Sequence, residues 1–397
     1  MSLQTVDDAL EILLSQVNVQ NRTERRPLGE VDGCVLSEDI AAPINVPPFA
    51  NSAMDGYAVR AADVRVGAPL KVTQIIAAGR EGEPHKPTNA SRIFTGAPLP
   101  FGADAILIQE DVDVDGDYIV PRATVVAGEH IRPEGQDMRR GSTVLEKGHR
   151  LMPADLALAA SVGLSDLPVF TPLKIALLST GDELVEPPAT LAPGQIFNSN
   201  RRALAASMAR LGFEPLDLGI VPDDEQITQR RLLEAANSAD VVISTGGVSV
   251  GDRDFVKQAV EASGRLAIWK LAIKPGKPLA FGETHGKPFF GLPGNPVSSL
   301  VTFLALARPF LLKMQGATQF RPELWPGIAA FDFEGGSRQE YLRVQAKPSR
   351  DGIKLHPFAE QGSGVMSSLA WATALAVIEP GRVVREGDRV DYLSLQF

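Results

Sequence analysis

The chain has 397 residues, 44% of them hydrophobic and 22% charged, which allows two or three domains with their own cores and excludes a disordered or fibrous chain. Its formal net charge of −9 excludes a generally basic surface for nucleic acid or an anionic membrane, so any anion site must be local. The single cysteine, Cys34, excludes an intrachain disulfide and a multi-cysteine zinc site, and it fits a reducing compartment.

The first predicted element is a helix near the amino terminus. Thr5 and Asp8 form a capping-box pattern ahead of the apolar residues 9–14, which predicts an amphipathic helix. No basic segment followed by an apolar one precedes it, so we expect no signal peptide and a cytoplasmic protein.

The next segment, residues 44–138, is rich in Val, Ile, Gly and Pro and predicts an inserted β domain. A strand is expected at residues 105–108 and a turn at residues 115–117. A helix follows at residues 154–160, behind Pro153 at its first turn. Residues 1–43 and 139–168 would form a helical and linker domain around this insertion.

Strands and helices alternate in residues 169–317. Strands are expected at 174–178, 216–221, 241–243, 266–269 and 289–290. Helices are expected at 200–211, at 223–237 with Asp223 as a cap, at 255–263, and in a long run that Pro296 opens behind Asn295. This order predicts a three-layer α/β domain with a mostly parallel sheet, whose ligands bind at the carboxyl ends of the strands.

Residues 318–397 return to a β pattern, with strands expected at 341–346, 375–378 and 390–395. The fold class is therefore multidomain α/β plus β. The most apolar stretch, residues 300–314, is broken by Arg308 and Pro309 and is shorter than a membrane span, so we expect a core helix and no membrane contact.

Two glycine-rich loops follow predicted strands of the α/β domain. Residues 179–183 carry glycine beside adjacent acids, which can hold Mg²⁺ or form only a solvated turn. Residues 244–254 carry three glycines and several hydroxyl residues, whose backbone N–H groups can bind an anion ahead of a helix. Asp223, which opens a helix between these loops, is either a helix cap or a metal ligand.

Lysines and prolines form the third and fourth loops. Residues 270–278 bring three lysines beside a stiff Pro-Gly-Lys-Pro turn, which favours an oxyanion over solvated surface lysines. Residues 291–296 form a tight loop at a helix start. The chain lacks a Walker A loop, a dinucleotide fingerprint and a nucleophile–histidine set, so metal and lysine electrostatics acting on phosphate remain.

With these motifs, the sequence resembles the molybdopterin molybdenumtransferases, that is, the MoeA proteins and the gephyrin E domain. The segments that carry the resemblance are 51–58, 94–97, 179–184, 246–254, 274–278 and 291–296. The resemblance implies a molybdopterin-binding-like α/β domain and a barrel-like C-terminal β domain. It also implies that molybdate is inserted into adenylylated molybdopterin, with Mg²⁺-dependent release of AMP.

The resemblance assigns roles to particular residues. Glu183, Asp223 and Asp254 would hold Mg²⁺ near the pyrophosphate, and Lys270 and Lys274 would neutralise the anions. Molybdate would contact Lys274, Lys277, Ser298, Arg343 and Ser363, with Arg338 and Ser368 as alternatives to the last two. The other expected substrate contacts are Thr180, Gly181, Asp182, Gly246, Gly247, Ser249, Gly251, Pro278, Pro293, Gly294, Asn295 and Pro296.

The resemblance further implies a homodimer in which each site is completed by the partner's β domain. Asp55, Thr95, Arg132 and Asp137 would act across that interface, although Asp55 beside Gly56 also fits an ordinary turn. Contact with the adenylyltransferase or with cofactor-accepting enzymes is also expected. Two alternatives are a molybdopterin adenylyltransferase, whose α/β domain has similar loops, and a non-catalytic scaffold of the same fold.

Overall fold

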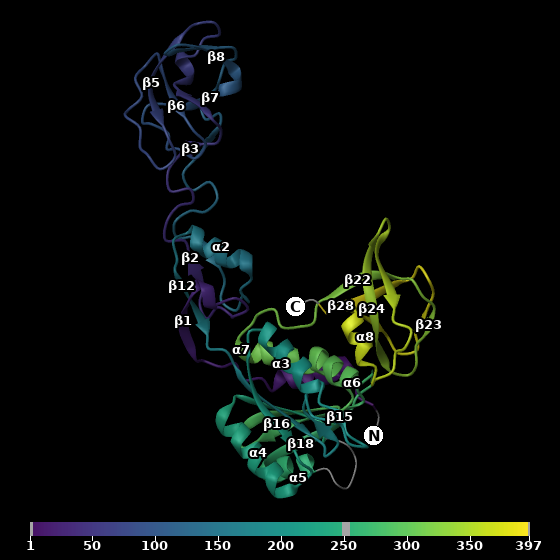
Figure 1. The fold of residues 1–397 in the computed structure, drawn as a ribbon. Coiled ribbons are helices and arrows are strands. Elements are labelled where there is room, and N and C mark those ends of the chain that lie inside the picture. The colour runs from purple at the N-terminus through teal and green to yellow at the C-terminus, as the bar shows by residue number, and fades with distance from the viewer. Residues whose placement is uncertain (1–2, 248–254, 396–397) are drawn as a thin grey trace. The chain divides into compact units, whose positions relative to one another are not determined.

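A computed structural model describes residues 3–247 and 255–395, which fall into two units (Figure 1). One unit comprises residues 1–37, 147–152 and 168–397, and the other comprises residues 38–146 and 153–167. The four-domain division drawn from the sequence is finer than this one and stays a prediction.

The opening helix α1 (Val6–Ser15) begins where the sequence predicts. The Thr5 hydroxyl accepts a hydrogen bond from the Asp8 amide at 3.1 Å and donates one to the Asp8 carboxylate at 2.7 Å. Residues 6, 9, 10, 13 and 14 are buried, at the spacing of one helix face. The helix therefore packs its apolar face into the main core of the larger unit.

The central sheet of the larger unit has the strand order β16-β13-β17-β21-β20-β18. The strands are β13 (Lys174–Thr180), β16 (Glu214–Val221), β17 (Val241–Thr245), β18 (Gly264–Lys270), β20 (Pro278–Thr284) and β21 (Lys287–Leu292). The first four in this order are parallel, whereas β20 pairs antiparallel with both β21 and β18. The mostly parallel sheet is confirmed. Strand β20 was missed, because a proline opens it and a glycine interrupts it.

Alternating side chains on the central strands face two helical layers (Figure 1). Ile175 and Leu177 of β13 join one core, and Ala176 and Leu178 join the other. The first core includes α1, α3 (Asn200–Arg210), α6 (Pro296–Thr302) and α7 (Arg308–Gln315). The second includes α4 (Glu225–Ser238) and α5 (Phe255–Ser263). The predicted three-layer arrangement follows from this alternation.

The long helix runs from Pro296 to Gln315, with a π-helical segment at Phe303–Ala307 between α6 and α7. At 20 residues it is longer than the apolar stretch suggested, and by length and composition it could cross a membrane. However, 78% of its apolar window is buried inside the protein. It is therefore a core helix, as predicted.

The N-cap of helix α4 (Glu225–Ser238) lies one residue later than the sequence indicated. Asp224, not Asp223, is its N-cap, and its carboxylate accepts a hydrogen bond from the Ile227 amide at 2.8 Å. The cap role predicted for Asp223 is wrong, because the preceding Pro222 is followed by two acids and only the second is at the capping position.

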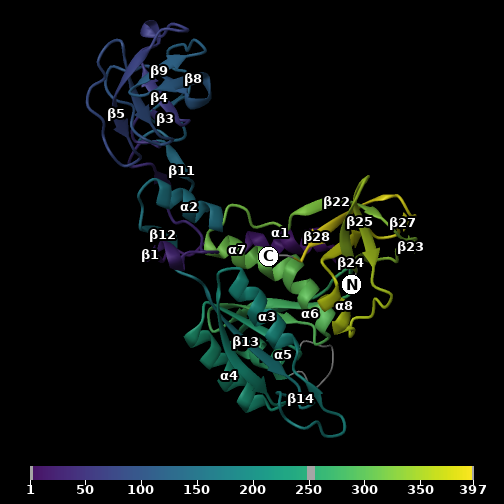
Figure 2. The same cartoon turned by 45° about the horizontal axis from the view of Figure 1, so that its top comes forward.

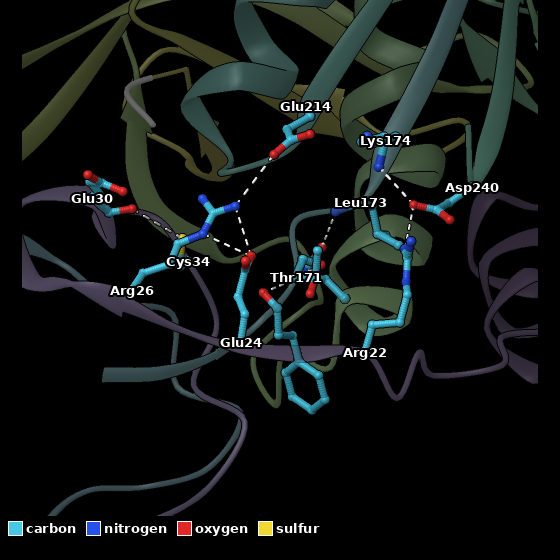
Figure 3. A network of polar contacts seen from close by, with 12 residues as sticks. Arg22, Glu24, Arg26, Glu30, Cys34, Thr171, Leu173, Lys174, Glu214 and Asp240 are labelled. Atoms are coloured by element: carbon cyan, nitrogen blue, oxygen red, sulfur yellow. Dashed lines mark hydrogen bonds and ion pairs between the residues drawn. The ribbon is translucent and has the colours of Figure 1, made fainter. Parts of the chain in front are cut away.

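A polar network at the amino ends of the strands fixes the N-terminal segment to the sheet (Figure 3). Arg22 forms an ion pair with Asp240 at 2.6 Å, and the same Asp240 oxygen accepts the Lys174 amide at 2.9 Å. Arg26 bridges Glu24 at 2.8 Å and Glu214 at 3.6 Å. These contacts occupy the end of the sheet opposite Gly181, Gly246 and Gly247, which follow the carboxyl ends of β13 and β17.

The C-terminal strands, yellow in Figure 2, close into a five-stranded barrel because β24 pairs with both β25 and β26. Its strands are β22 (Leu324–Ala329), β24 (Gln339–Ser349), β25 (Gly352–Pro357), β26 (Ala374–Ile378) and β28 (Arg389–Ser394). Helix α8 (Met366–Trp371) follows β25. The short strand β19 (Ile273–Lys274), from the α/β segment, pairs in parallel with β24.

The second unit is built on a six-stranded sheet of order β7-β4-β6-β5-β9-β8. Its strands are β4 (Gly56–Val59), β5 (Leu70–Ile76), β6 (Asn89–Ile93), β7 (Ala105–Ile108), β8 (Val112–Asp115) and β9 (Tyr118–Pro121). The strand predicted at 105–108 is β7, and the predicted turn joins β8 to β9. Shorter elements are β2 (Ile40–Ala41), β3 (Asn51–Ser52), β10 (Ile131–Arg132), β11 (Thr143–Leu145) and α2 (Pro153–Ser161).

Candidate functional site

A pocket of about 570 Å³ lies in the larger unit between the carboxyl ends of the sheet and loops of the barrel. It brings together residues from three of the predicted loops, one residue of α6, and two predicted residues of the C-terminal segment, Ser363 and the alternative contact Arg338. The predicted residues that line it are Gly246, Gly247, Lys274, Lys277, Pro278, Pro293, Gly294, Asn295, Ser298 and Ser363.

The pocket is positively charged although the chain is acidic overall. Among the described residues, its lining contains Lys274, Lys277 and Arg338 and no aspartate or glutamate. Clustered cations at a concave surface concentrate the positive potential there. Ser298 and Ser363 add hydroxyl groups to the same wall. This arrangement is suited to an oxyanion of tetrahedral or phosphate type.

Two glycines allow the second loop to pass close to its neighbour. Gly246 and Gly247 have φ of +83° and +65°, which side-chain-bearing residues rarely adopt. A Cβ at Gly246 would lie 2.7 Å from the Thr180 carbonyl oxygen, and one at Gly247 would lie 2.5 Å from Val256. The backbone therefore forms the pocket wall here because no side chain fits.

The start of α6 differs in detail from the prediction. Asn295 occupies the N-cap position, but its side chain makes no capping bond. The Val297 amide donates to the Ser363 carbonyl at 3.1 Å, and Pro296 has no amide hydrogen. The first turn therefore offers fewer donors to a ligand than predicted. Pro296 does not line the pocket.

The predicted acids Asp182, Glu183 and Asp223 lie beside the strand ends and are not among the residues that line the pocket. The Asp223 amide donates to the Asp182 carboxylate at 3.1 Å. Loss of solvation, and then repulsion from Asp182 and Glu183, raise the pKa of Asp223. Hard carboxylate oxygens that repel one another and remain open to water fit Mg²⁺ in their chemistry.

In residues 3–247 and 255–395, no group of three histidine, cysteine or acidic side chains is arranged to hold a metal ion. The predicted third acid, Asp254, lies outside the described residues, as do Ser249 and Gly251. Thr180 lies at the end of β13 and Gly181 follows it, with Asp182 and Glu183 next in the chain. Lys270 ends β18 and also lies outside the pocket lining.

Arg343, an expected molybdate contact, is not among the residues that line the pocket. It is 1% exposed, and its guanidinium donates to Ser368 Oγ at 3.1 Å, Tyr341 O at 3.2 Å and Gly362 O at 3.1 Å. Burial lowers the pKa of Arg343 to about 10. Arg338, the alternative, lines the pocket instead. Leu342 and Val344 face the barrel core, so β24 places Arg343 on its outer face, where it bonds to α8.

Two residues near the pocket were missed. Gln361 lines it and exchanges hydrogen bonds with the Arg343 backbone at 2.9 and 3.0 Å. Asn200 donates to the Gly294 carbonyl at 2.6 Å and so fixes the loop before α6. Gln361 had no sequence signal, because its position depends on closure of the barrel. Asn200 could have been noticed in the Asn-Ser-Asn run before α3.

In the second unit, Asp55 and Thr95 form a joined pair. One Asp55 oxygen accepts both the Thr95 amide at 2.7 Å and its hydroxyl at 2.8 Å. These bonds, with the charge of Arg92, lower the pKa of Asp55. Arg132 is exposed and pairs with Asn51 through β10 and β3. Asp137 is also exposed, and its amide donates to the Val46 carbonyl at 2.9 Å.

Three sequence families match successive parts of this chain. The MoeA N-terminal region (domains I and II) matches residues 4–163, and a probable molybdopterin binding domain matches residues 176–313. The MoeA C-terminal region (domain IV) matches residues 326–395.

Curated proteins and solved structures give concordant matches. A molybdopterin molybdenumtransferase from Haemophilus influenzae is 39% identical over 95% of each chain. One from Synechococcus elongatus is 37% identical over 98% of each chain. The crystal structure of the molybdopterin biosynthesis MoeA protein from Pyrococcus horikoshii OT3 is 31% identical, with a TM-score of 0.84 over 99% of this chain and all of that one.

Proposed function

Because this chain belongs to the MoeA family, we propose that it is a molybdopterin molybdenumtransferase acting in molybdenum cofactor biosynthesis. The proposed reaction inserts molybdate into adenylylated molybdopterin and cleaves its phosphoanhydride, with release of AMP. The observation that carries the proposal is the pocket of about 570 Å³, whose described lining has three cations and no acid in a chain of net charge −9.

The pocket residues receive the anionic parts of the substrates. Lys274, Lys277 and Arg338 are proposed to bind molybdate and a phosphate group through charge and N–H donors, and Ser298 and Ser363 through their hydroxyls. Lys270 is proposed to add charge beside this set. Arg343 holds the loop that carries Ser363 by its bond to the Gly362 carbonyl. Such fixed charges stabilise a transition state without reorganising during the reaction.

The magnesium site is proposed to lie among the acidic residues that follow the strand ends. Glu183, Asp223 and Asp254 would hold the ion, and Asp182 would orient the Asp223 backbone through the 3.1 Å bond. When bound, Mg²⁺ supplies charge stabilisation at the phosphoanhydride oxygens. The raised pKa of Asp223 supports this assignment, because a bound cation offsets both its loss of solvation and the repulsion from Asp182 and Glu183.

We further propose a cytoplasmic homodimer in which the second unit of one subunit completes the site of the other. Asp55, Thr95, Arg132 and Asp137 would then face the substrate. The Asp55–Thr95 pair supports this role, since its lowered pKa keeps the carboxylate ionised and its two bonds fix its orientation. Contacts with the adenylyltransferase and with cofactor-accepting enzymes belong to the same proposal.

The test is AMP release from adenylylated molybdopterin. Purified protein with this substrate should release AMP only when both molybdate and Mg²⁺ are present. The Arg338→Gln variant should raise the KM for molybdate about tenfold or more, because a charged donor to the oxyanion is lost. Arg385→Gln, which removes an exposed barrel arginine outside the pocket lining, is the matched control.

Two results would reverse the proposal. Formation of the adenylate from ATP, without molybdate insertion, would identify an adenylyltransferase. The absence of turnover in protein that folds and dimerises would instead support a scaffold.

A further inference from the structure

Glu340 is a buried carboxylate directly behind the wall of the cationic pocket. Glu340 as a whole is 2% exposed, and it is not among the residues that line the pocket. Its Oε1 accepts a hydrogen bond from the Gly336 amide at 3.0 Å. Its Oε2 lies 2.9 Å from Nζ of Lys274, whose side chain is 50% exposed at the pocket. Both carboxylate oxygens are therefore engaged, one by the backbone and one by a pocket lysine.

The pairing of two distant strands sets this contact. Strand β19 pairs in parallel with β24, and the register places Lys274 opposite Glu340 and Ile273 opposite Gln339. The Gln339 amide also donates to the Ala272 carbonyl at 2.8 Å. Arg338 donates to the Ile273 carbonyl at 3.2 Å. The barrel thus supplies both a pocket arginine and the carboxylate that holds a pocket lysine.

Charge alone gives no reason for a carboxylate at this place. Burying a carboxylate is unfavourable unless it is paired and hydrogen-bonded. A negative charge beside an oxyanion pocket also opposes anion binding. A lysine, however, has a flexible four-carbon stem that loses rotamer entropy when it is ordered. An acceptor that holds the ammonium before the ligand arrives removes much of that entropy loss from the binding step.

We propose that Glu340 is a positioning residue that holds the Lys274 ammonium in place for the oxyanion. The proposal rests on the function proposed above and adds to it a residue that does not touch the substrate. It makes a prediction opposite in sign to a simple charge argument. Removing the carboxylate should weaken oxyanion binding, even though the pocket becomes more positive.

The test is a double-mutant cycle on Glu340→Gln and Lys274→Gln, read by calorimetric titration of the full-length protein with molybdate alone. Glu340→Gln should weaken molybdate binding about tenfold, since a bond to a charged group is lost. In the Lys274→Gln background the same change should have little further effect, because Glu340 acts through that lysine. In turnover, Glu340→Gln should raise the KM for molybdate more than it lowers kcat.

Two further variants complete the design. Glu379→Gln removes an acid from an exposed pair with Arg382 in the same barrel and should leave binding unchanged. Glu340→Asp keeps the negative charge but shortens the side chain by one methylene, which moves the carboxylate away from the Lys274 ammonium. This variant replaces Glu340→Gln in the cycle if Glu340→Gln does not fold. It should also weaken binding, with an effect that disappears in Lys274→Gln.

Molybdate binding by Glu340→Gln as tight as in the wild type, or tighter, would overturn the positioning role. Equal effects in the presence and absence of Lys274 would overturn it as well. If the wild-type protein binds no molybdate and releases no AMP, the proposed function itself fails. If the wild type binds molybdate and releases AMP, but the effects of the two substitutions simply add, then the proposed function stands and the role of Glu340 fails.

Discussion

At the scale of single residues, the pKa values of two aspartates of the proposed site are shifted in opposite directions. The pKa of Asp223 is raised by loss of solvation and by the charges of Asp182 and Glu183. The pKa of Asp55 is lowered by two hydrogen bonds from Thr95 and by Arg92. Asp55 therefore stays ionised without a ligand, whereas the charges that act on Asp223 from residues 3–247 and 255–395 are those of the acids Asp182 and Glu183.

Asp223→Asn should change how stability depends on pH. Above the ordinary value of 3.8 the unfolded chain has lost a proton that folded Asp223 still holds. The free energy of unfolding of the wild type therefore falls as pH rises from 3.8 through the raised pKa. Asparagine removes this loss, so the thermal midpoint of the variant should rise relative to the wild type over that interval.

Magnesium provides the control for this prediction. At neutral pH, Mg²⁺ should raise the midpoint of the wild type more than that of Asp223→Asn, because binding to the folded state adds stability. Equal shifts in both proteins would exclude Asp223 from the metal site. Equal pH profiles without metal would contradict the raised pKa.

At the scale of elements, the helices of the α/β layers are held against the sheet by the side chains that each buries on one face. Leu232 and Leu233 are neighbours on α4 with the same helix propensity, yet they are 1% and 44% exposed. Leu232 packs with Ala235, Val256 and Val260 in the core between the sheet, α4 and α5. The helix is therefore held by one stripe of side chains and not by its average composition.

Substituting each leucine by alanine should separate the contribution of the buried face of α4 to stability from that of the exposed face. Leu232→Ala should lower the free energy of unfolding by about 2–5 kcal/mol, because it removes buried methyl groups and leaves a cavity. Leu233→Ala should change it by less than about 0.5 kcal/mol. Urea unfolding followed by circular dichroism compares the two. Similar losses for both would mean that α4 does not pack as described.

At the scale of the whole molecule, the proposed site needs residues from both units. Lys274 and Arg338 belong to the larger unit, and Asp55 and Thr95 belong to the smaller one. In the proposed dimer, each site takes the first pair from one subunit and the second pair from its partner. This arrangement can be tested without a structure of the dimer.

Mixed dimers of Asp55→Ala and Lys274→Ala subunits should recover activity that neither variant has alone. One of the two sites in such a dimer carries both substitutions, and the other carries none, so about half of the wild-type rate is expected. AMP release from co-expressed, differently tagged subunits measures it. A mixed dimer as inactive as its parents would contradict a site that combines Lys274 of one subunit with Asp55 of its partner.

The sequence by itself determined the elements and the chemistry of the loops. Periodicity of apolar residues defined α1, α3 and the parallel strands, and glycines next to acids and lysines marked the strand ends. These signals are local, since a helix face or a turn depends on residues a few positions apart. The family resemblance, which rests on such loops, is confirmed.

Only the tertiary structure decided which of these residues meet. It placed Arg338 at the pocket and buried Arg343 between β24 and α8, and it put Glu340 against Lys274. It also showed the antiparallel edge made by β20 and β18. The physical reason is that strand register and barrel closure depend on pairings between distant segments, and a shift of one residue turns a side chain to the opposite face.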